Sequence, residues 1–206
     1  MRTRTYDRIK RGIDVGASGL GLIVTAPLQL VIAGLIRSRL GSPVLFRQER
    51  PGKGGEVFTL VKFRTMREAD PNRGLIEDAD RLTALGRILR STSLDELPTL
   101  WNVIRGDMSL VGPRPLRTYY LPLYTPEQAR RHEVRPGVTG LAQVSGRNAL
   151  SWEDRFTLDV QYVDERSLCL DVKILLNTVT QVLRRSGTSA PGHATMPRFT
   201  GTGSDE

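Results

Sequence analysis

An apolar run bounded by basic residues is the feature that most limits how this chain can fold. It covers residues 13–36, follows a basic cluster within residues 1–11 and ends just before Arg37 and Arg39. A membrane-spanning helix needs about 20 apolar residues, so length alone permits a transmembrane segment. Pro27 lies near the centre of the run, where its missing N–H and its ring disrupt a helix. Cations at both ends favour keeping both ends on the cytoplasmic side of a membrane.

We therefore predict a re-entrant helix that enters the membrane, breaks at Pro27 and returns, so that both termini stay in the cytoplasm. A secretory signal would explain the order of basic and apolar residues. However, the run is too long for a signal core, and no small-residue cleavage site follows it. A buried core helix of a soluble protein is the third possibility, but a run this long and apolar is rarely found inside a small domain.

Beyond the run, the sequence predicts an α+β fold that is mainly helical and contains a β-hairpin. Residues 44–49 and 56–63 are rich in β-branched and aromatic side chains and flank a turn of glycine, proline and lysine. Apolar residues at helical spacing predict helices over 82–89 and 171–183. The polar residues 68–80 predict a surface loop.

Changes in composition divide the chain into three segments. They are an N-terminal basic segment with the membrane helix (1–40), a single main domain (41–185) and a C-terminal extension (186–206). Within the main domain, Thr125 and Ser151 are typical helix N-caps. The extension is rich in glycine, serine, threonine and proline; it is either docked or disordered, and its composition favours disorder.

The charge and the cysteine count limit the possible partners. The formal net charge is +8, which predicts an anionic partner: nucleic acid, an anionic membrane surface or phosphorylated substrates. The single cysteine, Cys169, excludes an internal disulfide and suits a reducing compartment. With only two histidines beside it, the chain offers too few ligands for a zinc site of the usual type.

An acidic pair among arginines is the strongest candidate for chemistry. Ser93 and Glu96 fit a capping box at the start of a helix. The box would place Asp95 and Glu96 at the positive end of the helix dipole, where a carboxylate stays ionised at neutral pH. The alternative is that both acids are ordinary first-turn residues. Arg90 precedes the pair and Arg114 follows it in a rigid Gly-Pro-Arg-Pro turn, an environment that indicates a phosphate-handling site.

Several other segments each allow two interpretations. Residues 50–55 place glycines between basic residues and either cradle phosphate or form the hairpin turn. The glycine-rich loop 135–148 either brings the backbone close to a ligand or is a structural turn. The aromatic residues of 119–124 belong either to the core or to a belt at lipid headgroups. Strand alternation places Lys62 and Arg64 on one face of the second strand.

Taken in order, these motifs resemble the bacterial sugar transferase family, the small monotopic phosphoglycosyl transferases. The resemblance extends from about Lys10 to Leu183. It rests on Lys10-Arg11, Val44-Leu-Phe-Arg-Gln, Val61-Lys-Phe-Arg-Thr-Met66, Arg90-x4-Asp-Glu-Leu-Pro98, Gly106-Asp-Met-Ser-x2-Gly-Pro-Arg-Pro115 and Arg135-Pro-Gly-x-Thr-Gly-Leu-Ala-Gln-Val144. The tail over 185–199 is most similar to the bacillosamine-phosphate transferases of protein glycosylation. Members often have serine before the membrane proline, whereas this chain has Ala26.

The resemblance implies a catalytic domain anchored by a monotopic re-entrant helix at the cytoplasmic face of the bacterial inner membrane. It implies transfer of a sugar 1-phosphate from a UDP-sugar to polyprenyl (undecaprenyl) phosphate with release of UMP, the first membrane step of glycoconjugate assembly. The tail points to an N-acetylated amino sugar such as diacetylbacillosamine. The implied partners are the UDP-sugar, the polyprenyl phosphate and membrane lipids, with no nucleic acid.

The same resemblance assigns roles to individual residues. Asp95 is the nucleophile that forms a covalent phosphosugar intermediate, and Glu96 handles a proton or positions the acceptor. Mg²⁺ is the expected cofactor, bridging the diphosphate with Asp95 as a contact. Phosphate or nucleotide ligands are expected among the nearby cations, since arginine suits paired contacts with oxygen. These cations are Lys62, Arg90, Arg114 and Arg147.

Two other hypotheses compete with this one. The same substrates could react by direct attack, without a covalent intermediate, and kinetics would distinguish the two because covalent catalysis predicts ping-pong behaviour. Alternatively, the chain could be a non-enzymatic basic module that binds nucleic acid or anionic lipid. The charge permits such a module, but no aromatic–basic interleaving or nucleic-acid motif supports it.

Overall fold

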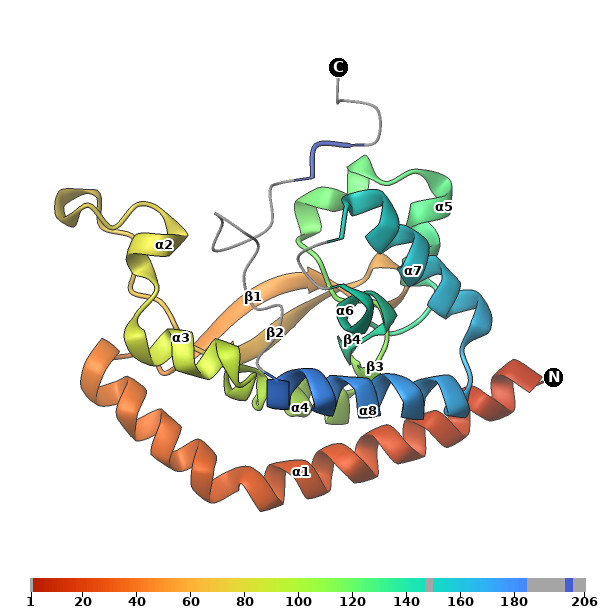
Figure 1. Ribbon diagram of the computed structural model, residues 1–206, viewed down its shortest axis with the longest axis horizontal. Coiled ribbons are helices and arrows are strands. Elements are labelled where there is room, and N and C mark those ends of the chain that lie inside the picture. The colour runs from red at the N-terminus through yellow and green to blue at the C-terminus, as the bar shows by residue number, and fades with distance from the viewer. Residues whose placement is uncertain (1, 147–149, 185–198, 202–206) are drawn as a thin grey trace.

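The computed structural model describes residues 2–146, 150–184 and 199–201, with one long helix beneath a body of shorter elements (Figure 1). That helix, α1 (Arg2–Leu40), contains Pro27 and continues through it as a single helix. It bends near its middle instead, with its apex pointing away from the body (Figure 1). The predicted break is therefore a bend.

Local hydrogen bonding gives a physical reason for the bend. Pro27 has no N–H to donate to the preceding turn. Two residues earlier, the Thr25 hydroxyl donates to the carbonyl of Gly21 at 2.6 Å and accepts from the Gln29 amide at 2.9 Å. Such bonding of a hydroxyl to the preceding turn also bends helices. Thr25 thus supplies a hydroxyl next to Ala26.

The predicted hairpin is confirmed. Strands β1 (Leu45–Pro51) and β2 (Val57–Phe63) pair antiparallel, from Leu45 opposite Phe63 to Pro51 opposite Val57. The short 3-10 turn η1 (Lys53–Gly55) joins them. Gly54 and Gly55 take φ values of 68° and 80°, a conformation that glycine adopts without steric cost. Of the two interpretations of residues 50–55, the hairpin turn is the one observed.

The segment after the hairpin contains the helices that lead to the acidic pair. In order they are η2 (Pro71–Arg73), α2 (Asp78–Arg81), α3 (Ala84–Ser91), η3 (Leu94–Glu96) and α4 (Thr99–Arg105). The predicted capping box at Ser93 is wrong. Ser93 has a left-handed φ of 57° and makes no capping bond with its side chain. Its N–H donates to the carbonyl of Arg90 and its carbonyl accepts from the N–H of Glu96, so it closes α3 and begins η3 through its backbone, without the predicted side-chain bond.

A parallel pair of short strands that the sequence did not predict joins two of the motifs. Strand β3 (Ser109–Val111) pairs with β4 (Gly137–Thr139), which leads into α6 (Leu141–Ser145). A Cβ on Gly137 would lie 2.1 Å from the backbone nitrogen of Gly112, and one on Gly140 would lie 2.2 Å from the carbonyl oxygen of Gly112. These glycines therefore allow backbone to pack on backbone, which supports the structural interpretation of this loop.

The remaining elements complete the body. They are η4 (Thr118–Leu123), α5 (Pro126–Ala129), η5 (Arg130–His132), α7 (Trp152–Glu165) and α8 (Leu168–Arg184). The capping box of Thr125 and the N-cap of Ser151 are confirmed. Tyr120 and Tyr124 belong to an aromatic core cluster that also contains Phe156 and Phe199, so the core interpretation holds for both tyrosines. Phe199 is only 4% exposed, which means that this part of the C-terminal extension is docked.

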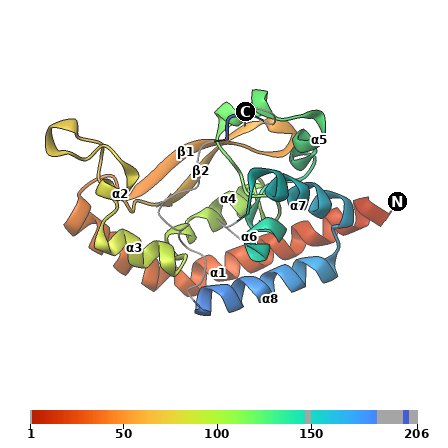
Figure 2. The ribbon, with the colours of Figure 1, turned by 45° about the horizontal axis from the view of Figure 1, so that its top comes forward.

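The bend divides α1 into a first arm, before Pro27, and a second arm, after it. Both arms pack against the same body. In the second arm, Ile32 and Ile36 join a core cluster with Phe63, Leu85 and Leu89. In the first arm, the Asp14 carboxylate accepts from the Ser109 hydroxyl at 2.7 Å and from the Leu110 N–H at 3.1 Å. The Arg11 guanidinium donates to the carbonyls of Val103 and Ile104, and Lys10 pairs with Asp171 of α8 at 2.9 Å. Helix α8 accordingly runs alongside α1 (Figure 2).

Candidate active site

A cleft of about 1040 Å³ lies among the hairpin, η3 and the β4–α6 segment. It brings together five of the six predicted site residues, namely Lys62, Arg90, Asp95, Glu96 and Arg114. The sixth, Arg147, lies outside the described residues. Residues from β2, α3, η3 and the Gly-Pro-Arg-Pro turn thus meet in one place, as a phosphate-handling site requires.

The backbone before the acidic pair is strained. Ser93 is the one residue other than glycine with a positive φ in the part of the chain described, and such a conformation costs roughly 1–3 kcal/mol. The chain turns at Ser93 from the end of α3 into η3, which carries Asp95 and Glu96. The turn places Asp95 in the interior, where it is 4% exposed. Strain at this point is typical of a functional site, where surrounding structure maintains it.

Asp95 is an acid held among cations. Burial, followed by the neighbouring charge of Glu96, raises the pKa of Asp95 to about 6, and the positive charges of Lys62, Arg90 and Arg114 oppose this rise. At neutral pH the carboxylate is mostly ionised. We attributed its ionised state to a helix dipole, but Asp95 lies in a single 3-10 turn and its stabilising charges come from side chains. For Lys62, burial lowers the pKa while Asp95 and Glu96 raise it.

Glu96 has a different environment from its neighbour. Its Oε1 accepts a hydrogen bond from Nη2 of Arg114 at 2.7 Å, and its side chain is partly exposed. This contact, with the charge of Glu96 as the largest cause, raises the pKa of Arg114. Among the described residues, Asp95 has no hydrogen bond or ion pair with an arginine side chain, whereas Glu96 fixes Arg114.

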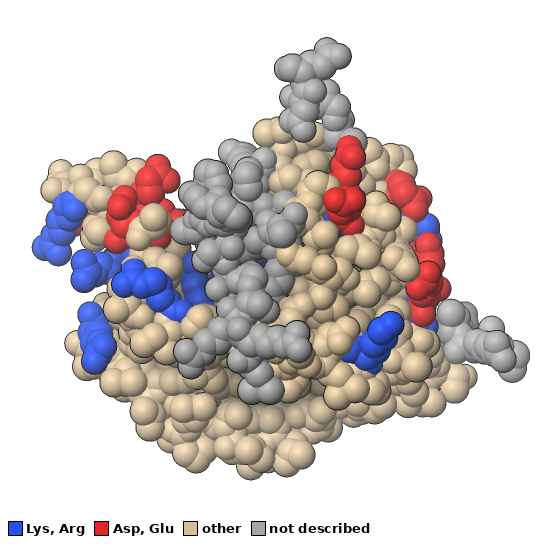
Figure 3. All heavy atoms as spheres, in the orientation of Figure 1, with Lys and Arg blue, Asp and Glu red and all other residues tan. Residues whose placement is uncertain are grey.

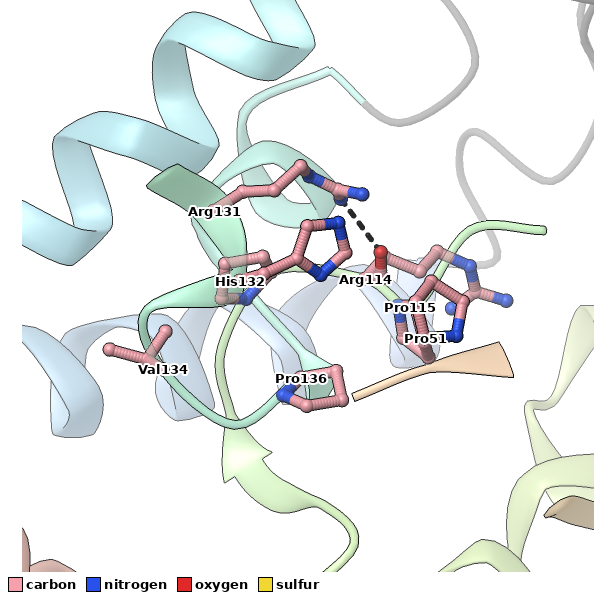
Figure 4. A pocket seen from close by; sticks show the side chains of 8 residues that line it. Pro51, Arg114, Pro115, Arg131, His132, Val134 and Pro136 are labelled. Carbon is pink, nitrogen blue, oxygen red and sulfur yellow. Dashed lines mark hydrogen bonds between the residues drawn. The ribbon is translucent and has the colours of Figure 1, made fainter. Parts of the chain in front are cut away.

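Two arginines, the buried Arg131 and the half-buried Arg50, hold the turn that carries Arg114. Nη2 of Arg131 donates to the carbonyl of Arg114 at 2.8 Å (Figure 4). Nη1 of Arg50 donates to the next carbonyl, that of Pro115, at 3.1 Å. Arg131 is itself fixed by a buried ion pair with Asp159 at 2.6 Å. In Figure 4 the side chain of Arg114 extends away from Arg131, so the two arginines act on opposite sides of this turn.

Helix α4 is joined to β2 by two polar side chains. The Thr99 hydroxyl donates to the carbonyl of Val61 at 3.0 Å. Asn102 accepts from the N–H of Val61 at 3.0 Å and donates to the carbonyl of Thr59 at 2.8 Å. These bonds fix the strand that carries Lys62 relative to the turn that carries Asp95. Sequence reasoning missed them, although a buried asparagine between the bulky apolar neighbours of α4 was a signal.

Cations outnumber carboxylates along the whole cleft. The cations that line it are Arg47, Arg50, Lys62, Arg64, Arg67, Arg81, Arg90, Arg114, Arg117 and Arg155. Both Lys62 and Arg64 line it, but the Arg64 guanidinium also donates to the carbonyls of Leu40, Gly41 and Ser42 and so caps α1. Arg50, Arg117 and Arg155 were not predicted, because isolated arginines in a basic chain carry no positional signal.

Comparison with known proteins agrees with this geometry. Residues 5–185 match the family described as Bacterial sugar transferase. The chain is 53% identical over 196 residues to the uncharacterized sugar transferase EpsL of Bacillus subtilis (strain 168), which covers 95% of this chain and 97% of the relative. It is 45% identical over 188 residues to the UDP-glucose:undecaprenyl-phosphate glucose-1-phosphate transferase of Caulobacter vibrioides (86% of this chain, 70% of the relative).

A longer relative is the undecaprenyl-phosphate galactose phosphotransferase of Salmonella typhimurium. It is 38% identical over 205 residues, which cover 91% of this chain and 43% of the relative. The match spans the apolar helix, the hairpin, the acidic pair and the Gly-Pro-Arg-Pro turn together. The chain belongs to the bacterial sugar transferase family and is a transferase of sugar-phosphate groups.

Proposed function

We propose that this protein transfers a sugar 1-phosphate from a UDP-sugar to undecaprenyl phosphate through a covalent intermediate on Asp95. One observation carries the proposal: a buried carboxylate with a pKa of about 6 faces a cleft lined by arginines. A carboxylate that is ionised at neutral pH can act as a nucleophile, and the cations suit a substrate with two adjacent phosphates.

In the first step, a carboxylate oxygen of Asp95 attacks the phosphorus that carries the sugar. The bond from that phosphorus to the bridging oxygen breaks, and the electron pair leaves with UMP. In the second step, a phosphate oxygen of the polyprenyl acceptor attacks the same phosphorus, and Asp95 leaves as a carboxylate. Arg114 and Lys62 stabilise the negative charge that moves between the phosphates. Glu96 keeps the Arg114 fork aimed into the cleft.

We also propose Mg²⁺ as the cofactor. Among the residues that the structure describes, no group of three or more acidic, histidine or cysteine side chains could enclose a metal. Mg²⁺ does not need such a group, since one or two carboxylates together with substrate phosphates usually hold it. Asp95 fits this requirement, with Glu96 beside it. The ion would neutralise charge on the diphosphate.

The membrane is the third partner in the proposal. Helix α1 is long and apolar enough to cross a membrane by length and composition. Its large outward side chains are exposed, Ile23 and Leu30 each by 75%. A second apolar stripe, Val172, Leu176 and Val179, is exposed on the neighbouring α8. The face over α1 is free of charged side chains in the view of Figure 3. These surfaces support a monotopic protein at the cytoplasmic face of the bacterial inner membrane.

For the sugar we propose an N-acetylated amino sugar, with diacetylbacillosamine as the first to test. The resemblance to the bacillosamine-phosphate transferases rests on residues 185–199. Residues 185–198 lie outside the described part of the chain, and Phe199 lies in the aromatic cluster. The relatives named above act on glucose and galactose, and a further one from Aeromonas hydrophila acts on N-acetylgalactosamine. A screen of UDP-sugars for UMP release would identify the donor.

The covalent step can be tested without the acceptor. Protein incubated with the UDP-sugar and Mg²⁺ should release up to one equivalent of UMP, and its intact mass should rise by one sugar phosphate. Peptide mapping should place the adduct on Asp95. Asp95→Asn keeps the shape of the side chain but removes the nucleophile, so it should give no UMP and no adduct while folding normally.

Two results would contradict the proposal. Protein that turns over with acceptor but shows neither burst nor adduct without it would indicate direct transfer. Protein that releases no UMP from any UDP-sugar, yet binds DNA in a salt-dependent manner, would indicate a nucleic-acid-binding module instead.

A further inference from the structure

Gln143 presents the unusual case of a buried amide with neither of its polar atoms paired. Both Nε2 and Oε1 are buried and lack a hydrogen-bond partner. Among the described residues, other side chains with buried unpaired atoms leave one such atom, whereas Gln143 leaves both its donor and its acceptor. Buried polar groups are nearly always hydrogen-bonded, and an exception needs an explanation.

A neighbouring glycine leaves room for the amide in the cleft. Gln143 lies on α6 and lines the cleft. Its Oε1 is 2.7 Å from the place where a Cβ on Gly140 would be, so the glycine leaves room for this orientation. Nearby polar groups on the same wall are already paired: the hydroxyls of Thr139 and Thr178 are 2.7 Å apart, and Asp159 is paired with Arg131. Gln143 is left to pair with a ligand.

The charges in the cleft indicate which kind of ligand group suits Gln143. Asp95, Glu96, Arg114 and Arg155 line the same cleft as Gln143. Burial lowers the pKa of Arg155, and the charge of Arg114 adds to this shift, so the two guanidinium groups lie near each other. Arg155 belongs to α7, which packs on α6, the helix of Gln143. The cations suit the diphosphate of the donor, and the neutral amide suits one of its neutral, hydrogen-bonding parts.

We propose that Gln143 recognises the uracil base of the nucleotide donor. A primary amide and the imide edge of uracil are complementary: Oε1 accepts from N3–H, and Nε2 donates to O4. Methylation of N3 removes the donor of this edge and would leave Oε1 without its partner. This inference rests on the proposed function and adds to it a specificity for the base of the nucleotide donor.

UMP binding tests the inference without requiring turnover. The full chain in detergent or nanodiscs is titrated with UMP and 3-methyl-UMP by calorimetry; neither ligand carries the donor sugar. The wild type should bind UMP about tenfold more tightly than 3-methyl-UMP, because each hydrogen bond lost to a buried partner weakens binding. Gln143→Met, which keeps the length of the side chain, should bind the two ligands within about twofold of each other.

Gln181→Met is the matched control. Gln181 belongs to α8, and its amide donates to the carbonyl of Val144 in α6 at 2.6 Å, so the variant disturbs the same helix without altering the cleft amide. It should keep the wild-type preference for UMP. Gln143→Met with an undiminished preference for UMP over 3-methyl-UMP would overturn the inference. So would unchanged UMP binding with a raised KM for the UDP-sugar, because the amide would then contact the sugar. If the wild type turns over no UDP-sugar, the proposed function itself fails.

Discussion

At the level of single residues, the contrast between Asp95 and Glu96 explains how two adjacent carboxylates can take different roles. Asp95 is buried and its pKa is raised to about 6. Glu96 is half-buried and bound to Arg114 at 2.7 Å. A nucleophile benefits from a carboxylate with little solvation, whereas a positioning group benefits from a firm partner. The two residues are consecutive in η3, and adjacent residues of a 3-10 turn point in different directions.

The pKa of Asp95 predicts the pH dependence of the first step. Asp95 must be ionised to attack, so the rate of UMP release without acceptor should fall as the pH drops through about 6. Glu96 is the second cause of the raised pKa. Glu96→Gln removes that negative charge, so the acidic limb should move to lower pH even though the reaction is slower. Glu133→Gln, in an exposed ion pair with Arg130, should leave the limb in place. An unmoved limb in Glu96→Gln would contradict this assignment.

Arg114 provides a second test at this scale. Its planar fork contacts Glu96 and its backbone is held by Arg131 and Arg50. Arg114→Lys keeps the charge but loses the fork, so turnover should fall on the order of 100-fold with a normal fold. Arg130→Lys, in an exposed cluster of carboxylates on the surface, should retain full activity. Turnover like the wild type in Arg114→Lys would show that its contribution is only charge.

At the level of elements, the site depends on how α4 is joined to β2. Asn102 is fully buried and bonds with both Val61 and Thr59 of β2. Asn102→Ala leaves these backbone groups unpaired in the interior and should lower the free energy of unfolding by roughly 2–3 kcal/mol. Denaturant unfolding in detergent measures the change. Arg105→Ala, at an exposed position of the same helix, should change it by less than about 0.5 kcal/mol. Equal stability of Asn102→Ala and the wild type would show that α4 is held by other contacts.

An element could be predicted from the sequence when the residues that specify it are neighbours in the chain. The hairpin and the Thr125 capping box follow from neighbouring residues, and both are confirmed. The pairing of β3 with β4 joins two three-residue segments far apart in the chain, and neither segment carries a local signal. Ser93 resembled an N-cap because the sequence pattern does not show which helix a serine at a junction belongs to.

The same distinction applies to the site. Lys62, Arg90, Asp95, Glu96 and Arg114 were predicted from their motifs, and the cleft contains them all. The ion pair of Arg131 with Asp159 was not, because a charged pair on two helices has the same sequence pattern whether it is buried or exposed. Burial of such a pair is decided by tertiary packing.

At the level of the whole molecule, α1 is fastened at both arms to one body. The first arm is held by Arg11 and Asp14, whose partners belong to α4 and to β3. The second is held by Ile32 and Ile36 in a core cluster. The apex between them carries exposed apolar side chains. A straight helix through a bilayer would place its ends about 30 Å apart across the hydrocarbon core. Because both arms pack on one body, we expect a re-entrant helix instead.

This arrangement predicts that both ends of α1 face the same side of the membrane. In a Cys169→Ser background, Thr5→Cys and Ser38→Cys place one thiol on each arm of α1. A membrane-impermeant maleimide should label both thiols in inverted vesicles and neither in right-side-out vesicles. Pro27→Ala restores the missing N–H and favours a straight helix. Straightening must pull the first arm from the body. When Pro27→Ala is added, Thr5→Cys should therefore become labelled in right-side-out vesicles in part of the population, while Ser38→Cys should not. Outside labelling of Thr5→Cys with Pro27 intact would show that the helix spans the membrane.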